Sequence, residues 1–233
     1  MFRILVLSLV LVLTGCASQK LQHSYQGDVR LRTLNVDIQP LRNPEESLSG
    51  SLKKITEIQR IIQSIEEVMD TEHQEKLMAD LRTFEKTLVE GIRKASGVPV
   101  VIPADSEIEI TWGDQQEISA IRFLYPFEKD DYMDLHATVS YPSMSSSQFG
   151  ARELNAERLT VTPKLDVQIE GYTRKDKLFW REYVGYESNK EYVLSNQYVL
   201  GMSTSKIQDG NIFLVPLAQG IEGRLKKVLA SKK

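Results

Sequence analysis

Apolar residues repeat along this chain with two different periods, and the change from one to the other falls at Gly97. Between Leu48 and Ile92 they recur every three or four positions, which is the spacing of an amphipathic helix. From Val98 onward they mostly alternate with polar residues, which is the spacing of a half-buried strand. We therefore expect an α+β fold, with an N-terminal helical hairpin followed by a mostly antiparallel sheet and a closing C-terminal helix.

The predicted helical hairpin covers about residues 47–96. Its second helix begins at a capping box, Thr71-Glu72-His73-Gln74, and ends at Gly97. Two interpretations of the hairpin stay open: it packs on the sheet, which is favoured, or it leaves faces free for a partner helix. Its apolar stripes consist of Leu48, Leu52, Ile55, Ile58, Ile62, Ile65 and Met69, then Leu77, Leu81, Phe84, Leu88 and Ile92.

The predicted sheet is built from stretches of alternating apolar residues that Pro and Gly separate. Residues 29–40 are expected to form a strand or an extended arm, 142–150 a surface loop, and 212–215 a short buried strand. The clearest hairpin spans 165–184 and turns at Arg174-Lys175-Asp176. Further strands are expected at 98–102, 107–110, 121–125 and 133–141, and the closing helix has an apolar face of Leu217, Ile221, Leu225 and Val228.

The N-terminus has the pattern of a secretory signal, because a basic residue, Arg3, precedes a short apolar run over residues 4–13. As a helix this run would cover roughly 15 Å, half of the roughly 30 Å of hydrocarbon that a membrane-spanning helix must cross. A cleaved signal is therefore favoured over a membrane span.

Directly after this run, Leu13-Thr14-Gly15-Cys16 resembles the lipobox of bacterial prolipoproteins. The resemblance implies cleavage between Gly15 and Cys16, a diacylglycerol thioether on Cys16, and acylation of its freed amine. Ala17, where that family's inner-membrane retention signal would be Asp, points to the outer membrane. Three acyl chains would hold the protein permanently, since two already suffice for stable anchoring. The alternative is an ordinary signal with an accidental cysteine, but Cys16 is the only cysteine and lipidation explains an unpaired thiol.

The expected organisation is a signal peptide at 1–15, a lipidated tether at 16–28 and a periplasmic α+β domain at 29–233. The formal net charge of −3 becomes −4 when Arg3 is removed with the signal. A chain of this charge has no bulk attraction for nucleic acid or for anionic lipid, so neither is expected as a partner. The expected membrane contact is the lipid on Cys16.

Two patterns resemble catalytic or metal-binding motifs, but neither has its expected context. S-x-x-K occurs at Ser51-Leu52-Lys53-Lys54 and Ser203-Thr204-Ser205-Lys206, without the S-D-N and K-T-G elements that complete such a site. Asp130-Asp131-Tyr132-Met133-Asp134 spells D-D-x-x-D, in which aspartates one helical turn apart would bind Mg²⁺. Its flanks alternate, so a charged turn before a strand is the better interpretation.

The three histidines, His23, His73 and His136, are far apart in sequence, and none has the spacing of a zinc ligand. His136 is expected to point to solvent. We identify no catalytic, cofactor-binding or metal-binding residues from the sequence, and no cofactor is predicted.

The helix exit Gly97-Val98-Pro99-Val100-Val101 and the Leu178-Phe179-Trp180 hairpin loosely resemble those of periplasmic envelope-assembly lipoproteins, including the curli-secretion type. The likeness is one of fold and does not by itself fix a function. The lipobox, the predicted helical hairpin and the missing catalytic constellation together favour a non-enzymatic outer-membrane lipoprotein that faces the periplasm and binds another envelope protein. Two alternatives stay open: a cell-wall or lipid hydrolase, and a carrier of lipid or small molecules with an enclosed apolar cavity.

Overall fold

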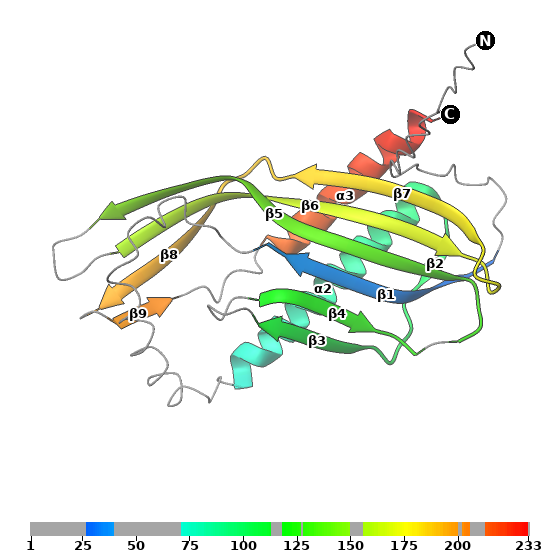
Figure 1. Cartoon of the computed structure of the whole chain (residues 1–233), viewed down its shortest axis with the longest axis horizontal. Helices are drawn as coiled ribbons and strands as arrows, with labels where there is room; N and C mark the ends of the chain where they lie inside the picture. Colours follow the sequence, from blue (N-terminus) through cyan, green and yellow to red (C-terminus); the bar gives the residue numbers. More distant parts are fainter. Residues whose placement is uncertain are drawn as a thin grey trace, which may run out of the picture.

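The computed structural model describes residues 27–39, 71–112, 118–126, 128–149, 156–199, 202–205 and 213–232. These residues form nine strands and two helices, which Figure 1 labels. In chain order the elements are β1 (Val29–Ile38), α2 (Thr71–Ser96), β2 (Val100–Val101), β3 (Glu107–Trp112), β4 (Ile118–Leu124), β5 (Tyr132–Phe149), β6 (Ala156–Tyr172), β7 (Leu178–Glu187), β8 (Tyr192–Val199), β9 (Met202–Ser205) and α3 (Leu214–Ala230).

All nine strands belong to one mixed sheet with the order β3-β4-β1-β5-β6-β8-β9. The short β2 pairs with β1, and β7 pairs with β6 beside β8. β1 runs parallel to β5 and to β2, whereas every other pair is antiparallel. β1, the first of the described strands, therefore lies in the middle of the sheet, between β4 and β5.

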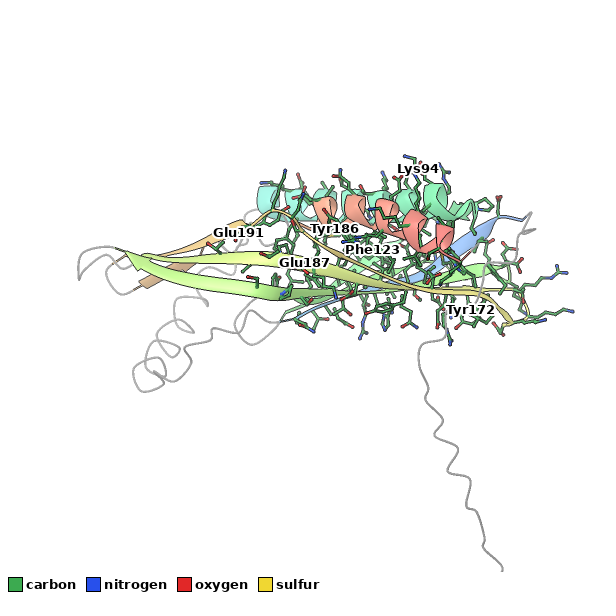
Figure 2. The ribbon with its side chains drawn as sticks, turned by 90° about the horizontal axis from the view of Figure 1, so that it is seen from above. Lys94, Phe123, Tyr172, Tyr186, Glu187 and Glu191 are labelled. Carbon is green, nitrogen blue, oxygen red and sulfur yellow. The ribbon has the colours of Figure 1, made fainter. Side chains whose placement is uncertain are left out.

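The two helices cover one face of the sheet, as the edge-on view in Figure 2 shows. α2 turns its predicted apolar face inward, and Leu81, Phe84, Leu88 and Ile92 are fully buried. It ends where predicted, because Gly97 adopts φ +77°, which favours glycine, and its N–H donates to the Arg93 carbonyl at 2.9 Å.

Large side chains fill the space between the helices and the sheet. Phe84 from α2, Phe123 from β4, Trp180 from β7 and Phe213 before α3 are each at most 1 % exposed. Along β6 every second residue from Val161 to Gly171 is buried, so the strand alternates as a half-covered strand should. Burial of this one face is the main source of stability.

The predicted fold class was wrong in its N-terminal half. The described residues contain no helical hairpin, since the predicted first helix, 48–69, lies outside them. α2 packs instead on the sheet, and α3 lies beside it, with the Cβ of Glu222 3.3 Å from the Cβ position of Gly91. The fold is α+β, but the sheet dominates it.

The sheet itself also differs from the prediction. It is mixed, because β1 pairs in parallel with β5, and β1 is a central strand and not an extended arm. Residues 142–149 are not a loop, because they continue β5 against β6; Pro142 falls in a register shift, where it donates no ladder hydrogen bond. The prediction of a short strand at 212–215 is also wrong, since α3 begins at Leu214.

The outer parts of β5 and β6, together with β8 and β9, extend beyond the two helices (Figure 1). Three aromatic rings mark the place where helical cover begins. Phe213 lies edge-on to Tyr141 of β5 and to Tyr192 of β8. Its ring centroid is 5.8 Å from that of Tyr141 and 5.9 Å from that of Tyr192. Burial raises the pKa of Tyr141, which fits a ring enclosed at this junction.

Two glycines of α3 provide a matched test of the helix–sheet packing. A Cβ at Gly220 would lie 2.2 Å from ring atoms of Tyr186, whereas one at Gly223 would meet nothing within 4 Å. We expect Gly223→Ala to stabilise the fold by about 0.5–1 kcal/mol through helix propensity, and Gly220→Ala to destabilise it by about 1–3 kcal/mol through overpacking. Urea unfolding monitored by circular dichroism measures both. A Gly220→Ala protein as stable as the parent would contradict this packing.

Candidate functional site

The face of the sheet opposite the helices is polar and has no cover among the described residues (Figure 2). Its centre lies on β1, β5 and β6, where Asn35, His136 and Gln168 are aligned side by side. Two residues further along each strand, and so on the same face, Thr33, Asp134 and Glu170 form a second row. Polar and charged side chains from three strands therefore meet on this open face.

A β-bulge in β1 directs two consecutive side chains to one carboxylate. The register with β5 shifts between Leu31 and Thr33. As a result, Arg32 Nε donates to Asp134 Oδ1 at 2.9 Å, a second guanidinium nitrogen donates to Oδ2, and the Thr33 hydroxyl donates to Oδ1 at 2.9 Å. A bulge can redirect a side chain in this way. Asp134 is thus held by a bidentate arginine and a hydroxyl.

Glu170 on β6 is the second carboxylate of the network. Its oxygens accept hydrogen bonds from Gln168 Nε2 at 2.9 Å, Arg181 Nε at 2.8 Å and the Tyr172 hydroxyl at 2.6 Å. Partial burial by itself would raise the pKa of Glu170, but the bonds from Tyr172 and Gln168 and the charge of Arg181 outweigh it and lower the pKa below its ordinary value. The carboxylate is therefore kept ionised.

Two stacked aromatic rings link the arginine that binds Asp134 to the tyrosine that binds Glu170. The Arg32 guanidinium lies 3.9 Å from the centroid of Tyr132, and Tyr132 stacks on Tyr172 with centroids 5.1 Å apart. The Tyr132 hydroxyl donates to Asp176 Oδ1 at 2.7 Å. Burial and this hydrogen bond raise the pKa of Tyr132 to about 12, so it stays protonated. We call Arg32, Thr33, Tyr132, Asp134, Gln168, Glu170, Tyr172 and Arg181 the open-face network.

The network borders a shallow hollow of about 210 Å³, which Thr33, Asn35, Asp134, His136 and Glu170 help to line. Asp134 and Glu170 face each other across β5 and β6, so their Cβ atoms lie about 4.5–5.5 Å apart. A hydrolase would need one such carboxyl with a raised pKa, as a proton donor. Glu170 has the opposite shift, and both carboxylates are engaged by arginines. The arrangement suits recognition by fixed donors and acceptors.

The aspartates of the D-D-x-x-D run point to separate partners. Asp130 pairs with Arg30 Nε at 2.9 Å, Asp131 accepts the Arg174 backbone N–H at 2.5 Å, and Asp134 belongs to the open-face network. The strand begins at Tyr132, so the run is a charged turn before a strand, as expected. The described residues contain no group of three or more His, Cys, Asp or Glu side chains that could hold a metal ion.

The remaining sequence candidates do not meet. His136 is exposed on the open face, as predicted, and the backbone of His73 lies in α2. Ser203 lies on strand β9 and not on a helix. His23, Ser51, Lys54, Lys206, Gly15 and Cys16 lie outside the described residues. None of the helices in the described ranges has the length and apolar character needed to cross a bilayer.

Two carboxylates are buried on the covered side of the sheet. Glu85 of α2, 1 % exposed, accepts the Tyr125 hydroxyl at 2.6 Å, and burial together with this bond raises the pKa of Tyr125. Glu182 of β7, 2 % exposed, accepts Lys232 Nζ at 2.5 Å and the Tyr183 backbone N–H at 3.1 Å. Glu85 connects α2 to the residue after β4, and Glu182 connects β7 to the segment after α3, so their roles are structural.

The sequence analysis did not identify the partners within the open-face network. Alternation along 164–170 could have placed Lys164, Asp166, Gln168 and Glu170 on one face. No local signal, however, indicates that Asp134 faces Glu170 or that Arg32 sits in a bulge, because both depend on the pairing of strands distant in sequence.

Comparison with known proteins identifies no family. No protein-family model matches the chain, and neither does any curated protein. Among solved structures, the chain is similar to a Helicobacter pylori protein described as a homolog of a neuraminyllactose-binding hemagglutinin, with 11 % identity and a TM-score of 0.31 over 92 % of this chain and 94 % of that one. A TM-score at this level does not establish a shared fold.

The lowered pKa of Glu170 gives a pH-dependent prediction. A carboxyl whose pKa is lowered by folding adds stability above its ordinary value of 4.5, and this stability is lost as the pH falls below that value. We expect Glu170→Gln to lower the free energy of unfolding by about 1–3 kcal/mol at pH 7 and to have little effect near pH 3. Urea titrations at both pH values measure this difference. Asp37→Asn, an exposed change on the same face, is the control and should stay within about 0.5 kcal/mol of the parent at pH 7.

Proposed function

We propose that this chain is a lipid-anchored, non-enzymatic outer-membrane lipoprotein that faces the periplasm and binds another envelope protein through the open face of its sheet. The Leu13-Thr14-Gly15-Cys16 pattern supports the anchor and its site at Cys16. The absence of a second cysteine supports it further, because lipidation gives the single thiol a role.

The observation that carries the binding role is the open-face network. Its donors and acceptors are fixed by one another, since Asp134 and Glu170 each bond an arginine and at least one neutral donor. A partner that binds such a surface meets side chains already ordered, so less conformational entropy is lost on association. Tyr183, beside Gln168 in the register, is 51 % exposed and adds a large aromatic contact.

The hydrolase alternative receives less support from the same geometry. It calls for a deep pocket and a carboxyl or histidine poised to transfer a proton. The hollow beside Asp134 and Glu170 is shallow and the pKa of Glu170 is lowered. His136, the histidine on that face, is exposed, and its side chain forms no hydrogen bond within the part of the chain that the structure describes.

The carrier alternative calls for an enclosed apolar cavity between the helices and the sheet. That space is filled by the packed side chains of Phe84, Phe123 and Trp180. A larger hollow of about 730 Å³ runs along the C-terminal half of α2, but it is open to solvent and is lined by Lys86, Glu90 and Lys94 among others. Neither hollow encloses apolar volume.

The anchor is tested by Cys16→Ser. We expect the parent protein to sediment with outer membranes and to start at a triacylated Cys16 by mass spectrometry, because acyl chains add about 0.8 kcal/mol per buried methylene. The Cys16→Ser protein should lose both properties. A mature chain that begins at another residue with an unmodified thiol would refute the anchor.

The binding face is tested by photocrosslinking in intact cells. A photoreactive amino acid at His136 reports on the open face, and one at Thr83, exposed on the outer side of α2, is the matched control. We expect a discrete protein adduct from position 136 that Arg181→Glu weakens, since Arg181 holds Glu170 in the network. Equal adducts from both positions, or none from position 136, would contradict the proposed face.

A further inference from the structure

The open face of the sheet keeps one register across six strands, so its side chains form regular rows. The shallow hollow of about 210 Å³ is lined by members of two neighbouring rows, above β1, β5 and β6. The central row, from β3 to β7, consists of Glu109, Arg122, Asn35, His136, Gln168 and Tyr183. The second row, from β1 to β7, consists of Thr33, Asp134, Glu170 and Arg181.

Each carboxylate that lines the hollow already has a cation of its own. The two arginines occupy carboxylate oxygens that a cationic ligand would need, so such a ligand would have to displace them. One row further on, a third carboxylate of the open face is paired with a lysine. The three ion pairs are Arg32–Asp134, Arg181–Glu170 and Lys164–Asp166.

The charges further from the hollow do not attract an anion. Asp37 and Arg122, which lie beside the hollow on β1 and β4, have opposite signs. Towards its borders the open face is acidic, with Glu107 and Glu109 on β3 and Glu187 on β7. An anionic ligand would be repelled by these carboxylates, so the hollow favours a ligand without net charge.

The hollow also contains hydrogen-bonding groups that the protein leaves unused. The side chains of Asn35 and His136 form no hydrogen bond within the described residues. Gln168 donates to Glu170 through Nε2, which leaves its carbonyl oxygen able to accept. A side-chain amide and a neutral imidazole each offer a donor and an acceptor. Hydroxyl groups, which also donate and accept, are the uncharged groups that this row fits best.

The size of the hollow and an exposed aromatic ring narrow the ligand further. Three strands about 4.8 Å apart and two rows roughly 7 Å apart give a floor for one six-membered ring with its hydroxyls. Tyr183, directly beside Gln168, is 51 % exposed and offers an aromatic surface to the apolar face of such a ring. Because the hollow is open to solvent, the rest of an oligosaccharide can continue over the sheet.

We propose that the hollow binds one uncharged sugar unit of a glycan, whose hydroxyls bond Asn35, His136 and Gln168 and whose ring packs against Tyr183. The ligand is additional to the protein partner proposed for the same face, since the hollow covers only β1, β5 and β6. That the glycan belongs to the cell envelope rests on the proposed function.

The test uses the full-length lipidated protein in a zwitterionic detergent, because a detergent with a sugar headgroup would compete for the hollow. The protein is applied to an array of immobilised tetramers of glucose, mannose, galactose and N-acetylglucosamine, each beside its sulfated counterpart. We expect binding to at least one uncharged tetramer. Binding to its sulfated counterpart should be about tenfold weaker, because the border of the open face is acidic.

Calorimetry with the tetramer that binds best then locates the site. Asn35→Ala should weaken binding about tenfold, and it should leave the melting temperature unchanged because this amide bonds nothing in the described chain. Tyr183→Ala should weaken binding by a similar factor, whereas Tyr183→Phe, which keeps the ring, should stay within about twofold of the parent. Gln219→Ala, which removes an exposed amide on α3, is the control and should not change the affinity.

Three results would overturn the inference: no binding to any uncharged tetramer, equal binding to the sulfated counterpart, or an affinity that neither Asn35→Ala nor Tyr183→Ala lowers. The photocrosslinking from position 136 judges the protein contact separately. A discrete protein adduct without sugar binding refutes the sugar site alone. Sugar binding without such an adduct refutes the protein contact and leaves the sugar site standing.

Discussion

One-sided burial is the constraint on which the rest of this structure depends. The sheet has helices on a single face, so every strand that passes under them must alternate between apolar and polar side chains. The apolar half forms the core with α2 and α3. The polar side chains lie close together on the open face, where the carboxylates of Asp134 and Glu170 face each other and would repel. Arg32 and Arg181 remove that conflict.

The parallel pairing of β1 with β5 links the N-terminal strand to the candidate site. It places β1 between β4 and β5, so the bulge at Arg32 falls at the centre of the open face. The same strand begins beside the loop that carries Asp131. One strand of ten residues thus connects the start of β5 to the open-face network.

Features set by local sequence could be predicted, and features set by distant pairing could not. The stripe of α2, its stop at Gly97, the β6–β7 hairpin and the face of α3 follow from neighbouring residues, and the structure confirms them. The central position of β1 has no local signal, because its partners follow many residues later. The serines of 143–147 suggested a loop, but pairing with β6 outweighs their weak strand propensity. For the same reason, the sequence could predict which residues of a strand lie on the polar face, but it could not predict which of them bind one another across strands.

Glu182 has a consequence for how two copies of this chain can meet. The β7 strand pairs with β6 alone among the described residues, so it is exposed to addition of a further strand. The Tyr183 amide, however, is already bonded to Glu182, and Lys232 holds that carboxylate in place. An incoming backbone would have to break this arrangement and leave a buried charge behind. Two copies of the chain can therefore lie side by side without pairing through their β7 edges.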